Sequence, residues 1–141
     1  MLRLGFLPSD FNPMLLMLGE AEDLRALAGV LRRFAREGGS LTLDELAFCA
    51  AWRTRVTLSD AGSGAGQPPG LHPLDDAGRF VWRLDAIRAA AFAEQVEVLA
   101  AAGQVAGSEM LECGIEEEIP VKVSRGEYTD DFLSVGAASS A

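Results

Sequence analysis

The segment from Glu20 to Glu37 constrains the fold most, because it predicts a long amphipathic helix. Acidic residues stand in its first turn and arginines in its last, which suits the helix dipole, and Gly38-Gly39 supplies a C-terminal stop. The apolar residues recur at helical spacing and form one stripe: Leu24, Leu27, Ala28, Leu31, Phe34 and Ala35. A helix with such a stripe must bury it against another element, so the chain needs a second layer.

Strand patterns surround this helix. Alternating or short apolar runs predict strands at residues 2–6, 14–18, 40–43, 52–58, 80–84 and 119–123. Length and flanking turns favour a strand for Met14 to Leu18, although periodicity alone does not exclude a helix there. Pro120 argues for an edge position or a strand end. A second helix is predicted at residues 85–102.

These elements predict an α+β fold: a two-layer arrangement in which two main helices pack on one face of a mostly antiparallel sheet. The 141 residues are 49% hydrophobic, which is enough for a core. We expect one domain over residues 1–134, with a flexible loop at about 60–78 and a frayed tail at 135–141.

The second helix carries more apolar surface than one sheet contact uses. Beside its main stripe, Ile87, Ala91 and Val98 form another patch at least about 120° away. This patch faces either the first helix or a second subunit, so a homodimer through helix 85–102 is possible.

Charge and hydropathy exclude several classes of protein. The net charge of −9 argues against nucleic-acid binding, which needs a basic surface. No run approaches 18 apolar residues, so we expect no membrane span. The first residues lack the features of a signal peptide, which predicts a cytoplasmic protein. Eleven arginines against one lysine suggest the codon bias of a GC-rich bacterium.

The cysteines and the single histidine offer little catalytic chemistry. Cys49 and Cys113 match no metal-ligand spacing and are expected to be buried free thiols, although a disulfide is possible. His72 alone makes a site with two or three histidines around zinc impossible within one chain. A histidine in a Gly/Pro-rich loop is usually solvated rather than catalytic, so we expect neither a catalytic residue nor a cofactor.

The segment GSGAGQPPGLHP, residues 62–73, resembles a phosphate loop only in its glycines. Such a loop opens a helix, whereas Gly66 is followed by Gln67 and Pro68-Pro69, which no helix continues through. The Gly-Lys-Ser/Thr motif is also missing. A long mobile loop that acts as a lid or binds a partner is the better interpretation.

The acidic residues concentrate near the C-terminus. Residues 109–131 carry a net charge of −6, out of −9 for the chain. Three interpretations compete: a solvated edge that resists aggregation, a docking surface for a basic partner, or a divalent metal site from Glu116, Glu118, Asp130 and Asp131. We predict no metal, because no EF-hand spacing is present.

The sequence therefore predicts a small, soluble, non-catalytic binding protein that engages a basic partner. Its predicted contact residues are Glu116, Glu118, Tyr128, Asp130 and Asp131. Two alternatives stay open. One is a small-molecule or metal-dependent enzyme whose pocket lies under loop 60–78, and the other is a structural homodimer.

Overall fold

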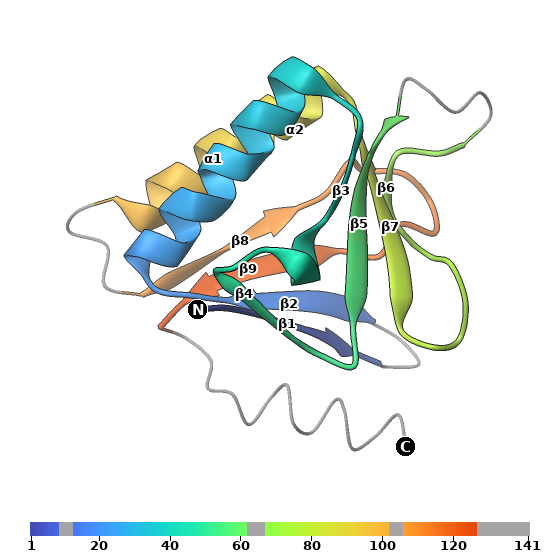
Figure 1. Ribbon diagram of the computed structural model, residues 1–141, viewed down its shortest axis with the longest axis horizontal. Coiled ribbons are helices and arrows are strands. Elements are labelled where there is room, and N and C mark those ends of the chain that lie inside the picture. Colours follow the sequence, from blue (N-terminus) through green and yellow to red (C-terminus); the bar gives the residue numbers. More distant parts are fainter. Residues whose placement is uncertain (9–12, 62–66, 102–105, 127–141) are drawn as a thin grey trace.

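The computed structural model describes residues 1–8, 13–61, 67–101 and 106–126 (Figure 1). Its helices are α1 (Ala21–Glu37) and α2 (Ala86–Ala100), with a short 3-10 helix η1 (Leu43–Glu45). Its strands are β1 (Leu2–Leu7), β2 (Met14–Leu18), β3 (Ser40–Thr42), β4 (Cys49–Trp52), β5 (Arg55–Asp60), β6 (Gly70–Pro73), β7 (Arg79–Leu84), β8 (Gly107–Leu111) and β9 (Val121–Arg125). The predicted α+β class is confirmed.

The strands form two sheets, of order β4-β1-β2-β9-β8 and β3-β5-β7-β6. Among the described residues, four of the seven strand pairs are antiparallel, and β1–β4, β2–β9 and β5–β7 are parallel. Among the described residues, the β4–β5 connection and an isolated bridge between Leu71 and Ile119 are places where the two sheets meet.

The helices lie side by side over the inner faces of both sheets (Figure 1). The α1 stripe is buried as predicted, and Leu24, Leu27 and Leu31 are fully inaccessible to solvent. Both sheets and α2 contribute to the same apolar core, in which Trp82 of β7 stacks on Phe92 of α2. Burial of this shared apolar surface is the main force holding helices and sheets together.

Helix ends are fixed by local hydrogen bonds. Asp85 accepts a bond of 2.7 Å from the backbone N–H of Arg88 and so caps the start of α2. At its other end, the Arg125 guanidinium donates to the carbonyls of Leu99 and Ala101. Gly38, with φ of +65°, ends α1 and donates its N–H to the carbonyl of Phe34.

Several sequence expectations need correction. The segment predicted as one strand at 52–58 is divided at Arg53-Thr54 into β4 and β5, which belong to different sheets. Residues 60–78 are not loop throughout, because β5 extends to Asp60 and β6 pairs with β7. Strand β8 was not predicted.

Two further expectations are resolved by burial and pairing. Pro120 marks the strand end, because β9 begins directly after it; the edge position is wrong, since β9 lies between β2 and β8. On α2, Ile87 and Val98 are 83% and 57% exposed. The expectation that this patch faces α1 is therefore wrong.

Candidate functional site

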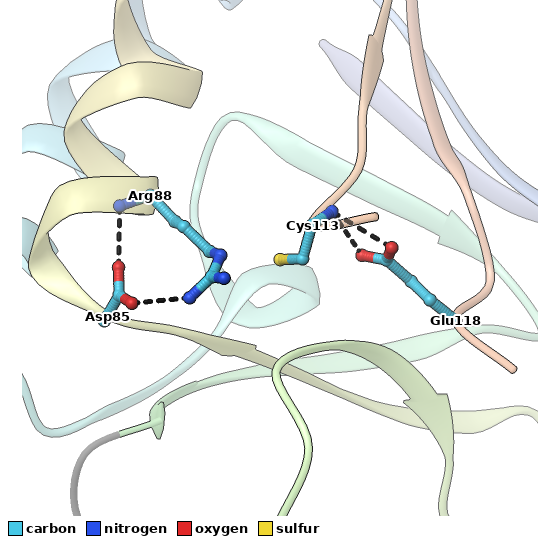
Figure 2. Close-up of polar contacts among 4 residues, drawn as sticks. All are labelled: Asp85, Arg88, Cys113 and Glu118. Atoms are coloured by element: carbon cyan, nitrogen blue, oxygen red, sulfur yellow. Dashed lines mark hydrogen bonds and ion pairs between the residues drawn. The ribbon is translucent and has the colours of Figure 1, made fainter. Parts of the chain in front are cut away.

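The first candidate site is the acidic turn, defined as residues 112–118 between β8 and β9. Its shape depends on one carboxylate. Glu118 accepts hydrogen bonds from the backbone N–H of Cys113, at 2.7 and 3.0 Å, and from that of Gly114, at 2.9 Å (Figure 2). The carboxylate also lies against Gly70, where a β-carbon would collide with it. The lack of a side chain at Gly70 therefore leaves the space that Glu118 occupies.

The tip of the turn presents acidic side chains to solvent. Glu116 and Glu117 form a tight turn in which Glu117 has a left-handed backbone, with φ of +64°. Glu112, Glu116 and Glu117 are all exposed, and within the described ranges none of the three has an ion-pair partner. The turn thus holds three unneutralised carboxylates on a fixed backbone.

Cys113 lies at the base of the turn, and its thiol points toward the guanidinium of Arg88 at the start of α2 (Figure 2). Burial is the largest cause that raises the pKa of this thiol to about 12, followed by the charge of Glu118. Burial likewise raises the pKa of Cys49 to about 11. Both cysteines are free, and neither has the low pKa of a nucleophile.

The residues predicted to contact a partner differ in where the structure places them. Glu116 is exposed at the tip of the acidic turn, whereas Glu118 is half-buried and holds the backbone of the turn. Tyr128, Asp130 and Asp131 lie outside the described residues. The prediction missed Glu112 and Glu117 as exposed members of the same turn. The clustering of acids around Gly114 was the signal in the sequence that pointed to them.

Basic side chains elsewhere are largely engaged within the chain. Arg32 pairs with Glu97, Arg33 with Glu37, Arg55 with Asp44, Arg79 with Asp75 and Arg88 with Asp85. Arg25 and Arg125 donate to carbonyl groups at the end of α2. These pairs use acids outside the acidic turn, so its negative charge is left uncompensated.

The second candidate site is the inter-sheet groove, a cavity of about 490 Å³ lined by residues of both sheets. Its lining comes from β1 and the residues between β1 and β2, from the end of β4 and the β4–β5 connection, from β6, β7 and the turn between them, and from Ile119. The residues are Phe6, Pro8, Pro13, Trp52, Arg53, Thr54, Pro73, Asp75, Asp76, Ala77, Gly78, Phe80 and Ile119. The rings of Phe6 and Phe80 are 4.8 Å apart and join one sheet to the other. The groove therefore has an aromatic lining with charged residues around it.

The wall of the groove at the β4–β5 connection is fixed by unusual backbone. Arg53 is left-handed, with φ of +49°, and this conformation lets the chain leave one sheet for the other. Thr54 follows it and is buried; its hydroxyl donates to the carbonyl of Trp52 at 2.7 Å and accepts from the N–H of Phe6 at 3.3 Å. Gly78 packs so closely that a β-carbon there would overlap the carbonyl oxygen of Arg53.

Some charged residues of the groove form ion pairs within the chain and others do not. Asp75 pairs with Arg79, and this hydrogen bond is the main reason that the pKa of the Asp75 carboxyl is lowered. Among the described residues, neither Arg53 nor Asp76 has an ion-pair partner. His72 lies in the adjoining strand β6 and does not line the groove; one of its ring nitrogens contacts the carbonyl of Pro69 at 2.8 Å. The groove thus combines one cation and one anion that are not paired with each other.

The groove bears on the enzyme alternative, because Pro73 and residues 75–78, at the end of the predicted loop, line it. Residues 62–66, the glycine-rich tip, lie outside the described residues. Within the described part of the chain, no three His, Cys, Asp or Glu side chains gather as a metal site would need.

Comparison with protein-family models, with curated proteins and with solved structures gives no match for this chain. In residues 1–8, 13–61, 67–101 and 106–126, neither helix has the length and apolar character needed to cross a bilayer.

Proposed function

We propose that this chain is a non-catalytic binding protein of the bacterial cytoplasm that engages a basic partner through its acidic turn. One observation carries the proposal. Glu112, Glu116 and Glu117 are exposed and have no ion-pair partner in the described ranges, while most arginines are paired elsewhere. The partner is therefore expected to be cationic.

Rigidity of the turn supports binding rather than mere solubility. Glu118 bonds to two backbone N–H groups and thereby fixes the positions from which the exposed carboxylates project. A preorganised surface loses less conformational entropy when it binds than a flexible one. On sequence grounds, Tyr128, Asp130 and Asp131 extend the same surface, with Tyr128 as an aromatic anchor.

The first test measures binding of a fluorescein-labelled nonalysine peptide by anisotropy at several salt concentrations. We expect the triple variant Glu112→Gln, Glu116→Gln, Glu117→Gln to bind at least about fivefold more weakly than the wild type at low salt, with a shallower salt dependence. The matched control removes three exposed acids from other elements: Glu22→Gln, Glu45→Gln, Glu94→Gln. Equal losses in the two variants would mean that only net charge matters and would refute the proposal.

The second test identifies the partner by capture from the lysate of the source organism with elution along a salt gradient. We expect a basic protein that the wild type and the control variant retain and the acidic-turn variant does not. Adding Asp130→Asn and Asp131→Asn should weaken retention further. A partner held equally by all variants would place the binding surface elsewhere.

A second candidate, a structural homodimer through α2, is favoured by the exposure of Ile87 and Val98. Helical spacing puts both side chains on the same side of α2, and exposed apolar patches commonly mark interfaces when they are contiguous. Light scattering over a hundredfold concentration range tests it: we expect a dimer mass for the wild type and a monomer mass for Ile87→Glu, Val98→Glu. A monomer mass for the wild type at every concentration would exclude this candidate.

A further inference from the structure

The inter-sheet groove has features of a binding site for a small molecule, separate from the acidic turn. Its volume of about 490 Å³ falls in the usual range for such sites, roughly 300–1,000 Å³. Such sites typically combine apolar and aromatic walls with a few polar groups that orient the ligand. Here Phe6, Phe80 and Trp52 supply the apolar part, and Arg53 and Asp76 supply the polar part.

The backbone of Arg53 is the observation that points to a ligand. A left-handed conformation is costly for a residue with a β-carbon and is normally given to glycine. Among the described residues, only Arg53 and Glu117 adopt it without being glycine. Strained backbone of this kind concentrates at functional positions. The change of sheet explains the left-handed backbone at this position, and the conformation directs attention to the one arginine that lines the groove.

The charges around the groove define the ligand. Arg53 lines the wall at the β4–β5 connection and Asp76 lines the β6–β7 turn, and in the described ranges neither is neutralised by an ion pair. The neighbouring Asp75 is already bound to Arg79. A purely anionic ligand would leave Asp76 unmatched, and a purely cationic ligand would leave Arg53 unmatched. A molecule that carries both charges beside an apolar group complements the whole groove.

We propose that the groove binds a zwitterionic α-amino acid with an apolar side chain. The Arg53 guanidinium binds the α-carboxylate, for which its planar donors are suited, and the Asp76 carboxylate binds the α-ammonium group. The side chain packs on the Phe6–Phe80 pair and Trp52. This site does not depend on the acidic turn, so either proposal stands if the other fails.

The test uses the full chain and four probes that share a phenyl ring, measured by calorimetry and by the fluorescence of the partly exposed Trp52. The probes are L-phenylalanine, 3-phenylpropionate without the ammonium group, phenethylamine without the carboxylate, and N-acetyl-L-phenylalanine amide with neither charge. We expect saturable binding of L-phenylalanine and about tenfold weaker binding of each singly charged probe, the loss of roughly one charge-assisted hydrogen bond. No saturable binding, or equal binding of the capped amide, would overturn the proposal.

Variants separate the role of Arg53 in binding from its role in the fold. Arg53→Gly removes both the side chain and the backbone strain, so we expect an unchanged or higher melting temperature and at least about tenfold weaker binding of L-phenylalanine. Arg36→Ala is the control: it removes an exposed arginine of α1 that does not line the groove, and it should leave the affinity unchanged. Asp76→Asn changes no backbone conformation and should also weaken binding about tenfold. Full affinity in Arg53→Gly and Asp76→Asn would refute the assignment.

Discussion

The acidic turn and the inter-sheet groove share one backbone feature but are stabilised by different kinds of contact. Each contains a non-glycine residue with left-handed backbone, Glu117 in the turn and Arg53 at the groove. In the turn, one side chain, Glu118, holds the backbone through hydrogen bonds. At the groove, close contact between the backbones of Arg53 and Gly78 and the packing of aromatic rings hold the wall.

This difference determines which substitutions destabilise each region. A turn held by one carboxylate is lost when that carboxylate is removed, while the rest of the fold stays in place. A wall held by backbone contact is insensitive to most side-chain changes but intolerant of added volume, because packed interiors have no spare space. Single substitutions should therefore have different costs in the two regions.

The largest effect is expected for Gly78→Ala. Its φ of +83° is unfavourable for alanine, and the added β-carbon would overlap the carbonyl oxygen of Arg53, which is backbone and cannot rotate away. We expect a loss of unfolding free energy on the order of 3 kcal/mol, measured by urea denaturation. Gly29→Ala is the control: nothing lies within 4 Å of its β-carbon position in α1, so it should stabilise by about 0.5–1 kcal/mol. A loss of less than about 1 kcal/mol for Gly78→Ala would contradict backbone control of the groove.

Glu118→Ala tests the turn in the same way. The backbone N–H groups of Cys113 and Gly114 lose their acceptor, so we expect a loss of about 1–3 kcal/mol together with weaker binding of the nonalysine peptide. Glu116→Ala should leave stability within about 0.5 kcal/mol of the wild type, because that side chain is exposed and unpaired in the described ranges. Equal stability of the two variants would show that Glu118 does not hold the turn.

The sequence predicted elements whose signals are local. Helix α1 lies within one residue of its predicted start, because its apolar stripe, charged ends and terminal glycines are all encoded within its own segment. The exposure of Glu116 also followed from the local concentration of charge, whereas Glu112 and Glu117 were missed. By contrast, β6 and β8 have weak patterns of their own and become strands through pairing with β7 and β9. Their existence depends on tertiary context, which overrides local propensity.

The sites were less predictable than the fold for the same reason. The lining of the groove comes from segments that are distant in sequence, and they meet only because the chain changes sheets at Arg53. Nothing in the alternating pattern from Trp52 to Leu58 marks that break. The role of Glu118 also depends on a chain reversal that places its carboxylate beside Cys113. Long-range geometry of this kind has no signature in residue spacing.

Thr54→Val tests a smaller loss of stability at the groove. Like Glu118→Ala, it removes a side chain that hydrogen-bonds to the backbone. The hydroxyl of Thr54 bonds to the carbonyl of Trp52 and to the N–H of Phe6, so its removal leaves both groups without that partner. We expect a loss of about 1–2 kcal/mol in thermal or urea unfolding. Thr54→Ser keeps the hydroxyl and should recover most of this loss. If Thr54→Ser and Thr54→Val destabilise equally, the loss comes from altered packing and not from the missing hydroxyl.

The smallest effect concerns the thiol of Cys113, which reports on the acidic turn without disturbing it. Burial and then the charge of Glu118 raise its pKa from 9.0 to about 12, so the folded thiol keeps its proton where the unfolded one has lost it. The free energy of unfolding should therefore fall as pH rises from 9 toward 12, because the folded state then binds more protons than the unfolded state. Glu118→Gln removes the carboxylate charge but leaves burial, the largest cause, in place, so the pKa of Cys113 should fall and remain above 9.0. The pH dependence of iodoacetamide labelling, read on the Cys113 peptide by mass spectrometry, measures this shift. An unchanged labelling profile would mean that the Glu118 carboxylate does not raise the pKa of this thiol.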